Sequence, residues 1–405
     1  MAETPAPRIA VLASLFPSAA RPGAGLFIRE RMFRVARHIP LMVISPQPWF
    51  PGQALLRKFK PGYRPQAPAF EIQNGIAVHH PRFFALPAIG RRFDGWFMAL
   101  ACRRLIAQFR RDGGALIDAH FTYPEGYAAT RLARRFGLPA TITLRGTEVP
   151  QHRVPALRRR MARALAGAAR VFSVSDSLRR LALELGADPA KTEVVGNGVD
   201  SERFAPLDRA EARRRYGLAA DARVLVSVGG LVERKGMHRV IACLPELLRS
   251  FPTLHYLIVG DGGPEGDMRP ELDAQVARLG LERRVHFLGA LPPDELKWPL
   301  SAADVAVLAT RNEGWANVIL EAMACGLPMV TTDVGGNAEV VCRDELGTVV
   351  PFGDQTALTA ALAAALARDW DRAAIRAYAQ ANHWDRRVAQ LVRAFAGLMP
   401  RGTVA

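Results

Sequence analysis

A short apolar run, followed by a turn and then a helical pattern, recurs along this chain of 405 residues. The runs at 8–14, 116–119, 223–228 and 303–309 are too short for buried helices and suit buried strands. Strands that alternate with helices form parallel sheets with helices on both faces. The pattern fills two halves of roughly 150–200 residues each. It therefore predicts an α/β fold of two Rossmann-like, doubly wound domains that face each other across a cleft.

The most informative repeat lies at residues 303–328. Its first part predicts a buried strand, and Gly326 near its end is typical of a helix terminus. We expect the helix between them to begin near Trp315 or Ala316. Gly314 has no Cβ, so a ligand can approach the first unpaired backbone N–H groups of that helix. The repeat therefore predicts a phosphate site at an open helix N-terminus.

Two carboxylates in this repeat, Glu313 and Glu321, are eight residues apart. A fully helical path would separate them by ~12 Å. Acid and base pairs that cleave glycosides are roughly 5–9.5 Å apart, so the spacing favours two ends of one elongated ligand. Asn317 and Glu321 are one turn apart and share a helix face. An ordinary helix entry with a solvated glutamate is the alternative reading of these residues.

The string E-G-W-A-N-V-I-L-E-A-M-A-C-G-L-P at 313–328 resembles the Glu-x7-Glu signature of retaining family 4 glycosyltransferases, which have the two-domain GT-B fold. The resemblance implies that Glu313 contacts hydroxyl groups of the donor sugar and that Glu321 holds the ribose. It also implies a retaining, metal-independent transferase whose donor is a nucleoside-diphosphate sugar, UDP- or GDP-linked, with no further cofactor. The donor site would include the residues that join the two glutamates: Gly314, Trp315, Ala316 and Asn317.

A second group of candidates follows the strand 223–228, in the string G-G-L-V-E-R-K-G. Lys235 supplies a mobile positive charge suited to a diphosphate, and Gly229 and Gly230 lie just before it. The family that the chain resembles carries an arginine in place of Gly230. Either Arg234 compensates for that arginine or one phosphate contact is missing. The loop Gly335-Gly336-Asn337 could also line the sugar or phosphate site.

Three loops in the first half resemble cleft loops of the same family. The string H-F-x-x-P-x-G begins with His120, and the resemblance implies that this histidine contacts the transferred sugar, which makes it a catalytic candidate beside Glu313. The loop after the first strand contains Gly23 and Gly25 and resembles the family's glycine loop. Arg145 and Glu148 follow another strand and could face the acceptor or the cleft, or could pair with each other.

The positive charge is concentrated in the first half of the chain. Residues 1–200 contain 30 Lys and Arg against 13 Asp and Glu, and the remaining residues contain 24 against 25. An anionic membrane surface, a phosphate-bearing acceptor or nucleic acid would explain this charge, as would arginine-rich coding that places Arg on solvated helices. The absence of any nucleic-acid-binding pattern argues against nucleic acid. The basic amphipathic pattern at 155–169 is consistent with a lipid-contacting helix or with an ordinary domain helix.

The resemblance also suggests domain limits: an acceptor-binding domain at 1–202, a donor-binding domain at 203–370, and helices at 371–405 that cross back to the first domain. Residues 48–87 have little periodicity and predict a long irregular insertion over the cleft. The four cysteines are scattered and no acidic metal-binding pair is present, which predicts a protein without a metal or a disulfide framework. The sequence has neither a signal pattern nor an apolar run of about 20 residues. We therefore expect a cytoplasmic protein that is peripheral on the inner face of the membrane.

The function that we expect is transfer of a sugar to an acceptor hydroxyl, with a lipid-linked saccharide of exopolysaccharide or envelope synthesis as the acceptor. Two alternatives stay open: a nucleotide-sugar epimerase of similar architecture, and a non-catalytic subunit that binds nucleotide sugars. A nicotinamide dehydrogenase is disfavoured because no Gly-x-Gly-x-x-Gly follows the first strand.

Overall fold

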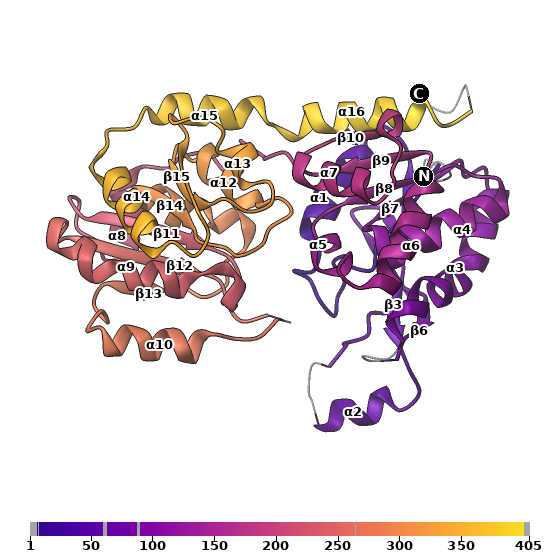
Figure 1. Cartoon of the computed structure of the whole chain (residues 1–405), viewed down its shortest axis with the longest axis horizontal. Helices are drawn as coiled ribbons and strands as arrows, with labels where there is room; N and C mark the ends of the chain where they lie inside the picture. The colour runs from indigo at the N-terminus through magenta and orange to yellow at the C-terminus, as the bar shows by residue number, and fades with distance from the viewer. Residues whose placement is uncertain (1–5, 7, 60–62, 87–89, 264, 401–405) are drawn as a thin grey trace. The chain divides into compact units, whose positions relative to one another are not determined.

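The structure, a computed structural model, describes residue 6 and residues 8–59, 63–86, 90–263 and 265–400. The chain forms two compact units (Figure 1). The first unit comprises residues 1–197 together with 385–405, and the second unit comprises residues 198–384.

The first unit is built on a sheet with the strand order β10-β9-β8-β7-β1-β2-β5-β4. All neighbouring strands of this sheet are parallel except β4 and β5. A second, two-stranded sheet pairs β3 with β6. The strands of this unit are β1 (Ile9–Leu12), β2 (Leu41–Ile44), β3 (Gln47–Trp49), β4 (Phe70–Gln73), β5 (Ile76–His79), β6 (Arg82–Phe84), β7 (Leu116–His120), β8 (Ala140–Leu144), β9 (Arg170–Ser173) and β10 (Thr192–Val194).

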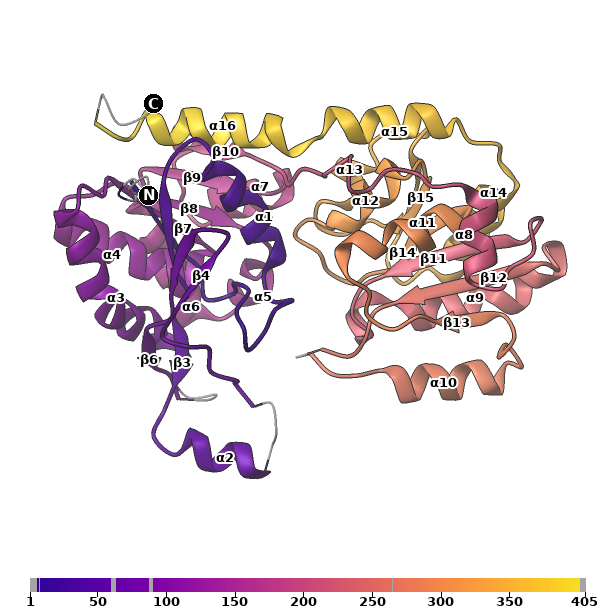
Figure 2. The same cartoon turned by 180° about the vertical axis from the view of Figure 1, so that it is seen from behind.

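Helices cover both faces of this sheet because side chains alternate along each strand. Ala10 and Leu12 of β1 pack under α3 and α4, whereas Ile9 and Val11 pack under α1 and the C-terminal helix α16. Figures 1 and 2 show α3 and α4 side by side. The helices of the unit are α1 (Leu26–Val35), α2 (Gln53–Phe59), α3 (Asp94–Arg111), α4 (Tyr127–Phe136), α5 (Glu148–Gln151), α6 (Pro155–Ala166), α7 (Asp176–Glu184) and α16 (Trp384–Ala396), with short turns η1 (Arg91–Phe93), η2 (Thr122–Gly126) and η3 (Pro189–Lys191).

The second unit has a fully parallel sheet with the strand order β13-β12-β11-β14-β15-β16. Numbered within the unit, this is the 3-2-1-4-5-6 order of a Rossmann fold, and the order reverses between β11 and β14. Ligands of such sheets bind at the carboxyl ends of the strands beside this reversal. The strands are β11 (Arg223–Val228), β12 (Leu254–Val259), β13 (Val285–Phe287), β14 (Val305–Leu308), β15 (Met329–Thr332) and β16 (Gly347–Val350).

Two buried clusters fill the faces of this sheet. Val224 and Val226 of β11 pack under α12 and α15, and Leu225 packs under α9 and α14. The two predicted doubly wound sheets are therefore confirmed. The helices of the unit are α8 (Arg209–Arg215), α9 (Met237–Ser250), α10 (Arg269–Arg278), α11 (Lys297–Ala302), α12 (Asn317–Ala324), α13 (Asn337–Val340), α14 (Gln355–Ala367) and α15 (Arg372–Ala381), with short turns η4 (Glu233–Lys235) and η5 (Pro293–Glu295).

The segment at 371–405, which the sequence assigns as a whole to helices crossing to the first domain, is divided between the units. Helix α15 packs on α12 within the second unit, because Ile375 and Ala379 are buried in its core. Helix α16 belongs to the first unit except for its first residue, Trp384. Within the first unit, Phe395 of this helix is fully buried against Phe172.

The expectation of an irregular insertion at 48–87 is wrong for its described residues, while 60–62 and 87 lie outside them. The segment contributes β4 and β5 to the main sheet and β3 and β6 to the small one. These short strands lack an alternation of buried and exposed residues, because β4 alternates between exposed and half-buried residues and β5 is half-buried except at Val78. In the described part of the chain, no helix is long and apolar enough to cross a membrane.

Candidate active site

The strand–loop–helix repeat singled out in the sequence forms β14, a loop and α12, at the point where the strand order of the second unit reverses. Helix α12 begins at Asn317, with Ala316 in an extended conformation before it, so the predicted start is confirmed to within two residues. In the described structure, Ala316 before the helix makes no side-chain capping hydrogen bond, so the N-terminus of α12 lacks the side-chain acceptor that caps many helices. These are the conditions under which a helix N-terminus binds phosphate.

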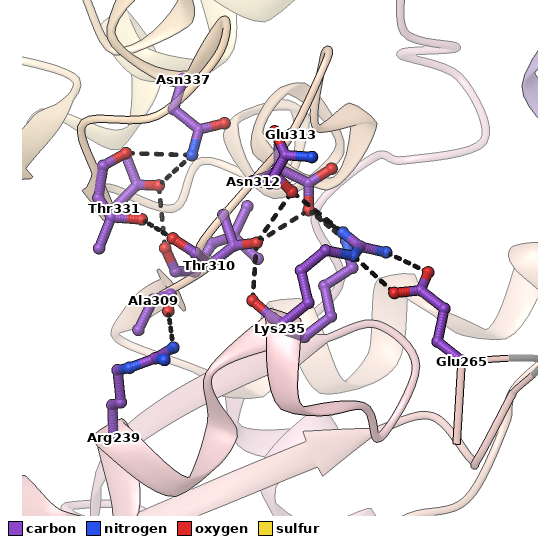
Figure 3. Close-up of polar contacts among 12 residues, drawn as sticks. Lys235, Arg239, Glu265, Ala309, Thr310, Asn312, Glu313, Thr331 and Asn337 are labelled. Atoms are coloured by element: carbon purple, nitrogen blue, oxygen red, sulfur yellow. Dashed lines mark hydrogen bonds and ion pairs between the residues drawn. The ribbon is translucent and has the colours of Figure 1, made fainter. Parts of the chain in front are cut away.

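One carboxylate oxygen of Glu313 is shared by three donors (Figure 3). Lys235 Nζ lies 2.6 Å from Oε1, Arg234 Nη1 lies 3.2 Å from it, and Thr310 Oγ1 lies 3.3 Å from it. The Glu313 side chain is 11% exposed and the Lys235 side chain 17%, so the contacts are partly shielded from water. Three of the predicted donor-site residues therefore meet in one charged cluster.

Arg234 has a second anionic partner, Glu265, which the sequence does not single out. Its Nε and Nη2 donate to the two oxygens of Glu265, each at 2.9 Å, while Nη1 also donates to the carbonyl oxygen of Asn312 at 3.1 Å. This bidentate pair fixes the plane of the guanidinium. The hydrogen bonds with Glu265 and the charge of Glu313 raise the pKa of Arg234 above its ordinary value.

The glycine at 230 leaves open space where the resembled family carries an arginine. A Cβ built on Gly230 would meet nothing closer than the carbonyl oxygen of Asp261, at 3.6 Å. A Cβ on Gly229 would touch the aliphatic carbons of Lys235 at 3.4 Å, and φ there is +157°. Residue 230 can therefore accept a larger side chain without a clash at its Cβ.

The loop between β15 and α13 supports the backbone of Glu313. Gly335 has φ +57°, and a Cβ there would lie 1.7 Å from the carbonyl oxygen of Glu313. Asn337 is fully buried, and its Nδ2 donates to Thr331 Oγ1 at 3.0 Å and to the Thr332 carbonyl oxygen at 3.1 Å. The Nδ2 group of Asn337 therefore joins this loop to β15, and the expectation that the loop lines the sugar or phosphate site stays a prediction.

The remaining donor-site candidates lie on or beside α12. Gly314 and Ala316 are buried, whereas Asn317 and Glu321 are half-buried and one turn apart on the helix. The indole Nε1 of Trp315 is buried and has no hydrogen-bond partner in the described part of the chain, so it is a donor that a ligand could use.

His120, at the end of β7 in the first unit, is fully buried between the side chains of Asp118 and Arg145. Arg145 Nε donates to its Nδ1 at 2.9 Å, and its Nε2 lies 3.2 Å from Asp118 Oδ2 without hydrogen-bond alignment. Since Nδ1 accepts, the neutral ring carries its proton on Nε2. Burial and then the charge of Arg145 lower the pKa of His120 to about 4. The imidazole is therefore neutral near pH 7.

A buried network extends from His120 to the end of the first unit. Arg145 Nη1 donates to Asn197 Oδ1 at 3.3 Å, and Arg31 Nη2 donates to the same oxygen at 2.9 Å. Arg31 also donates to the backbone carbonyl oxygens of residues 195 and 196 at 2.7 and 2.9 Å. Burial lowers the pKa of Arg31 to about 10 and the pKa of Arg145 well below its ordinary value.

Glu148 does not form an ion pair with Arg145, the pairing that the sequence left open. It is fully buried, and its carboxylate accepts from the backbone N–H groups of Thr122, Arg145 and Gly146 at 2.9, 3.2 and 2.8 Å. These bonds hold the loop that follows His120, where Phe121 has the unusual φ of +77°. Glu148 is therefore a positioning residue for this loop.

The glycine loop of the first unit contains one glycine that its geometry requires. Gly25 precedes α1 with φ +67°, and a Cβ there would lie 2.2 Å from the carbonyl oxygen of Leu15. A Cβ on Gly23 would meet nothing within 4 Å. Nearby, Ser14 Oγ donates to Glu125, whose second carboxylate oxygen is buried without a partner in the described structure. Burial raises the pKa of Glu125 to about 7.

The described residues contain no group of three or more His, Cys, Asp or Glu side chains placed to hold a metal ion. Residues 17–203 match the family described as Glycosyltransferase Family 4, and residues 208–382 match the family described as Glycosyl transferases group 1. Over 372 residues the chain is 30% identical to TuaC of Bacillus subtilis, a glycosyltransferase named for teichuronic acid biosynthesis. That match covers 89% of this chain and 88% of TuaC. The chain belongs to glycosyltransferase family 4.

Other relatives match this family 4 glycosyltransferase over shorter lengths. It is 36% identical to a D-inositol 3-phosphate glycosyltransferase of Geodermatophilus obscurus over 56% of its own length, and it spans about half of that relative, 51%. It is 37% identical to the GDP-mannose-dependent alpha-(1-6)-phosphatidylinositol monomannoside mannosyltransferase of Mycolicibacterium smegmatis, over 62% of this chain and 67% of that protein.

The solved structure of HepE from Anabaena in complex with UDP has the same fold as this family 4 member. The TM-score is 0.73 at 21% identity, and the match covers 96% of this chain and 99% of HepE. The predicted GT-B fold is therefore confirmed.

The sequence missed the acids that hold the basic side chains of this family 4 member. Glu265 follows β12 outside any regular element, and Asp118 is two residues before His120 on β7. Side chains two apart on a strand point to the same face, so the Asp-x-His spacing could have suggested the second contact. The pairing of Arg234 with Glu265 joins residues 31 positions apart and has no such local signal.

Proposed function

We propose that this protein transfers a sugar, with retention of configuration, from a nucleoside-diphosphate sugar to an acceptor hydroxyl. The observation that carries the proposal is the cluster at the start of α12, where Lys235 and Arg234 converge on Glu313 beside an uncapped helix N-terminus. Two cations and a helix N-terminus stabilise negative charge, which in this reaction grows on the departing diphosphate. HepE in complex with UDP and the GDP-mannose dependence named for the mycobacterial relative support a nucleotide donor.

In the absence of donor, the Glu313 carboxylate takes the place of an anion between the two cations. When the diphosphate binds, its oxygens accept from Lys235 and Arg234, and Glu313 is released to accept from hydroxyl groups of the donor sugar. The bond between the anomeric carbon and the phosphate oxygen breaks, and the acceptor oxygen forms the new bond on the same face. The acceptor proton passes to the departing phosphate oxygen.

We further propose a lipid-linked saccharide of the cell envelope as the acceptor, met at the cytoplasmic face of the membrane. Two relatives support this acceptor class, one named for teichuronic acid and one for a phosphatidylinositol mannoside. The excess of basic residues at 1–200 supports contact with an anionic surface. His120 is proposed as a neutral donor to the transferred sugar, through the proton that its ring carries on Nε2.

The test is a panel of UDP- and GDP-linked sugars incubated with membrane extract, with product formation and free diphosphate followed for wild type and Glu313→Gln. We expect transfer by the variant to fall by roughly 10²–10³-fold, because the carboxylate contacts the sugar as charge develops. Calorimetry with UDP should show binding at least as tight as in wild type, since the amide no longer competes for Lys235 and Arg234. Glu345→Gln, at an exposed position, is the matched control.

Three results would contradict the proposal. Unchanged transfer in Glu313→Gln would remove this residue from the site. Conversion of the nucleotide sugar without any acceptor would indicate an epimerase. Donor binding with neither transfer nor hydrolysis for every sugar of the panel would indicate a binding subunit.

A further inference from the structure

Exposed large apolar side chains are concentrated in the first unit. In the described part of the chain, ten residues of this kind lie in the first unit and only Leu279 and Phe352 lie in the second. Three of the ten follow one another along η1 and α3: Phe93 is 45% exposed, Trp96 46% and Leu100 52%. Large apolar residues grouped on one surface are typical of a contact site.

These side chains project from a helix whose opposite side is already packed. Met98, Cys102 and Ile106 of α3 are fully buried against the sheet. Trp96 and Leu100 are one turn apart on the exposed side, and they line a groove of about 370 Å³ between α3 and α4. The groove therefore belongs to the outer surface of α3 and α4, which Figures 1 and 2 show side by side.

Arginines surround this apolar stripe on both helices. Arg91 and Arg92 precede it and Arg103 and Arg104 follow it, while α4 contributes Arg131, Arg134 and Arg135 on the other side of the groove. None of the seven forms an ion pair with a carboxylate in the described residues. Asp94 is the only acidic residue of α3, and α4 has none. The surface thus combines exposed apolar groups with unpaired positive charge.

A second arginine-rich helix of this unit, α6, has its large apolar side chains covered. Its apolar residues Leu157, Met161 and Leu165 are buried in the unit, and Arg158 pairs with Glu184 at 3.1 Å. Of the two readings that the sequence left open for residues 155–169, the structure favours the ordinary domain helix. The positive charge on α6 can attract an anionic partner from a distance, but the large apolar side chains of the helix itself are buried, and only Val154 just before it is exposed in the described part of the segment.

We propose that the exposed face formed by η1, α3 and α4 binds the surface of an anionic lipid bilayer. Tryptophan and leucine side chains insert at the level of the headgroups, where an indole ring is most stable, and the arginines pair with lipid phosphates. The charge complementarity is direct, since basic side chains near an anionic leaflet each contribute about 1 kcal/mol. The proposal rests on the proposed function in that it locates the membrane contact on this surface. Lipid binding itself requires neither donor nor acceptor.

The test measures sedimentation of the full-length protein with vesicles of phosphatidylcholine containing 30% phosphatidylglycerol, and with vesicles of phosphatidylcholine alone. Arg103→Gln/Arg134→Gln/Arg135→Gln removes three charges from the face, and Arg153→Gln/Arg159→Gln/Arg163→Gln removes three exposed charges from α6 and the turn before it. We expect roughly a hundredfold weaker binding for the first triple variant and only a few-fold for the second. Trp96→Ser/Leu100→Ser should weaken binding by about tenfold.

Depth is measured with brominated lipids, which quench only tryptophans that enter the bilayer. The part of the quenching that disappears in Trp96→Phe belongs to Trp96, and this conservative variant keeps the apolar volume if the serine variant fails to fold. Equal loss of binding in the two triple variants would overturn the proposal, as would equal quenching of wild type and Trp96→Phe. Binding to heparin or RNA that is as tight and is lost in the same variants would indicate a polyanion site instead.

The result is separable from the proposed transfer reaction. Donor turnover with a water-soluble saccharide acceptor should be unchanged in the α3 and α4 variants, whereas Glu313→Gln should bind vesicles like wild type. Loss of vesicle binding with transfer intact would therefore support the proposed lipid-binding surface. Wild-type vesicle binding by Glu313→Gln would show that lipid binding does not depend on transfer.

Discussion

Glu313 holds two cations of the proposed donor site close together. Two cations close together repel each other and lose hydration when a site is partly closed. Here Lys235 and Arg234 both contact Oε1 of Glu313, so each is kept in place by the same negative atom. Glu265 adds a second restraint on Arg234 alone. We propose that Arg234 compensates for the arginine that the family carries in place of Gly230.

This replacement predicts a rescue. Arg234→Ala should weaken donor binding by roughly tenfold or more, because one charge-assisted contact to the diphosphate is lost. Adding Gly230→Arg should restore most of the affinity, since a Cβ at residue 230 meets nothing closer than 3.6 Å. Calorimetry with UDP measures both effects. Gly230→Ala in the Arg234→Ala background is the control. A rescue by alanine equal to that by arginine would contradict the proposal that Arg234 compensates for the missing arginine.

At the scale of elements, the site depends on how the loops after β14 and β15 contact each other. The backbone of Gly335 occupies the space directly beside the carbonyl of Glu313, and Thr332 Oγ1 donates to the Thr310 carbonyl oxygen at 2.6 Å. Close backbone approach of this kind is available only to glycine. The loop that contains Gly335 therefore helps to set the position of Glu313.

Gly335→Ala should reduce transfer by tenfold or more and lower the stability of the second unit by more than the usual cost of alanine at positive φ, about 1 kcal/mol. The added Cβ would force the loop away from Glu313. Gly280→Ala is the matched control, because Gly280 has φ +66° but a Cβ there meets nothing within 4 Å. Activity assays and thermal melts of the two variants check the difference. Equal activity and equal melting temperatures of the two variants would show that the contact with Glu313 contributes to neither transfer nor stability.

At the scale of the whole molecule, charge and burial are distributed differently between the two units. Residues 1–200 carry the excess of positive charge, yet several ionisable groups of the first unit are deeply buried. Their pKa shifts oppose each other: burial raises the pKa of Glu125 to about 7 and lowers the pKa of His120 to about 4. Stability of the first unit should therefore depend on pH through groups that lie beside its candidate site.

The contribution of Glu125 can be isolated by comparing wild type with Glu125→Gln. Below its ordinary pKa of 4.5 the carboxyl is protonated in the folded and unfolded states alike. Between pH 4.5 and about 7 the unfolded chain loses the proton while the folded protein keeps it, so stability falls as pH rises. We expect wild type to lose up to about 3 kcal/mol relative to the variant over this range. Urea unfolding at several pH values measures it, and a constant difference would contradict the assignment.

The sequence by itself predicts the two doubly wound sheets and the start of α12, because strand and helix periods and turn residues are local signals. The choice of Glu313 and Lys235 as site residues rests on the resemblance of their strings to family 4 and stays a prediction. Only the tertiary structure decided what depends on residues distant in sequence. It joined Arg234 to Glu265, turned Glu148 toward backbone N–H groups rather than toward Arg145, and divided the C-terminal helices between the units. It also separated α6, whose apolar side is covered, from α3, whose Trp96 and Leu100 remain exposed. The physical reason is that partners and burial are set by packing between elements, which no local pattern encodes.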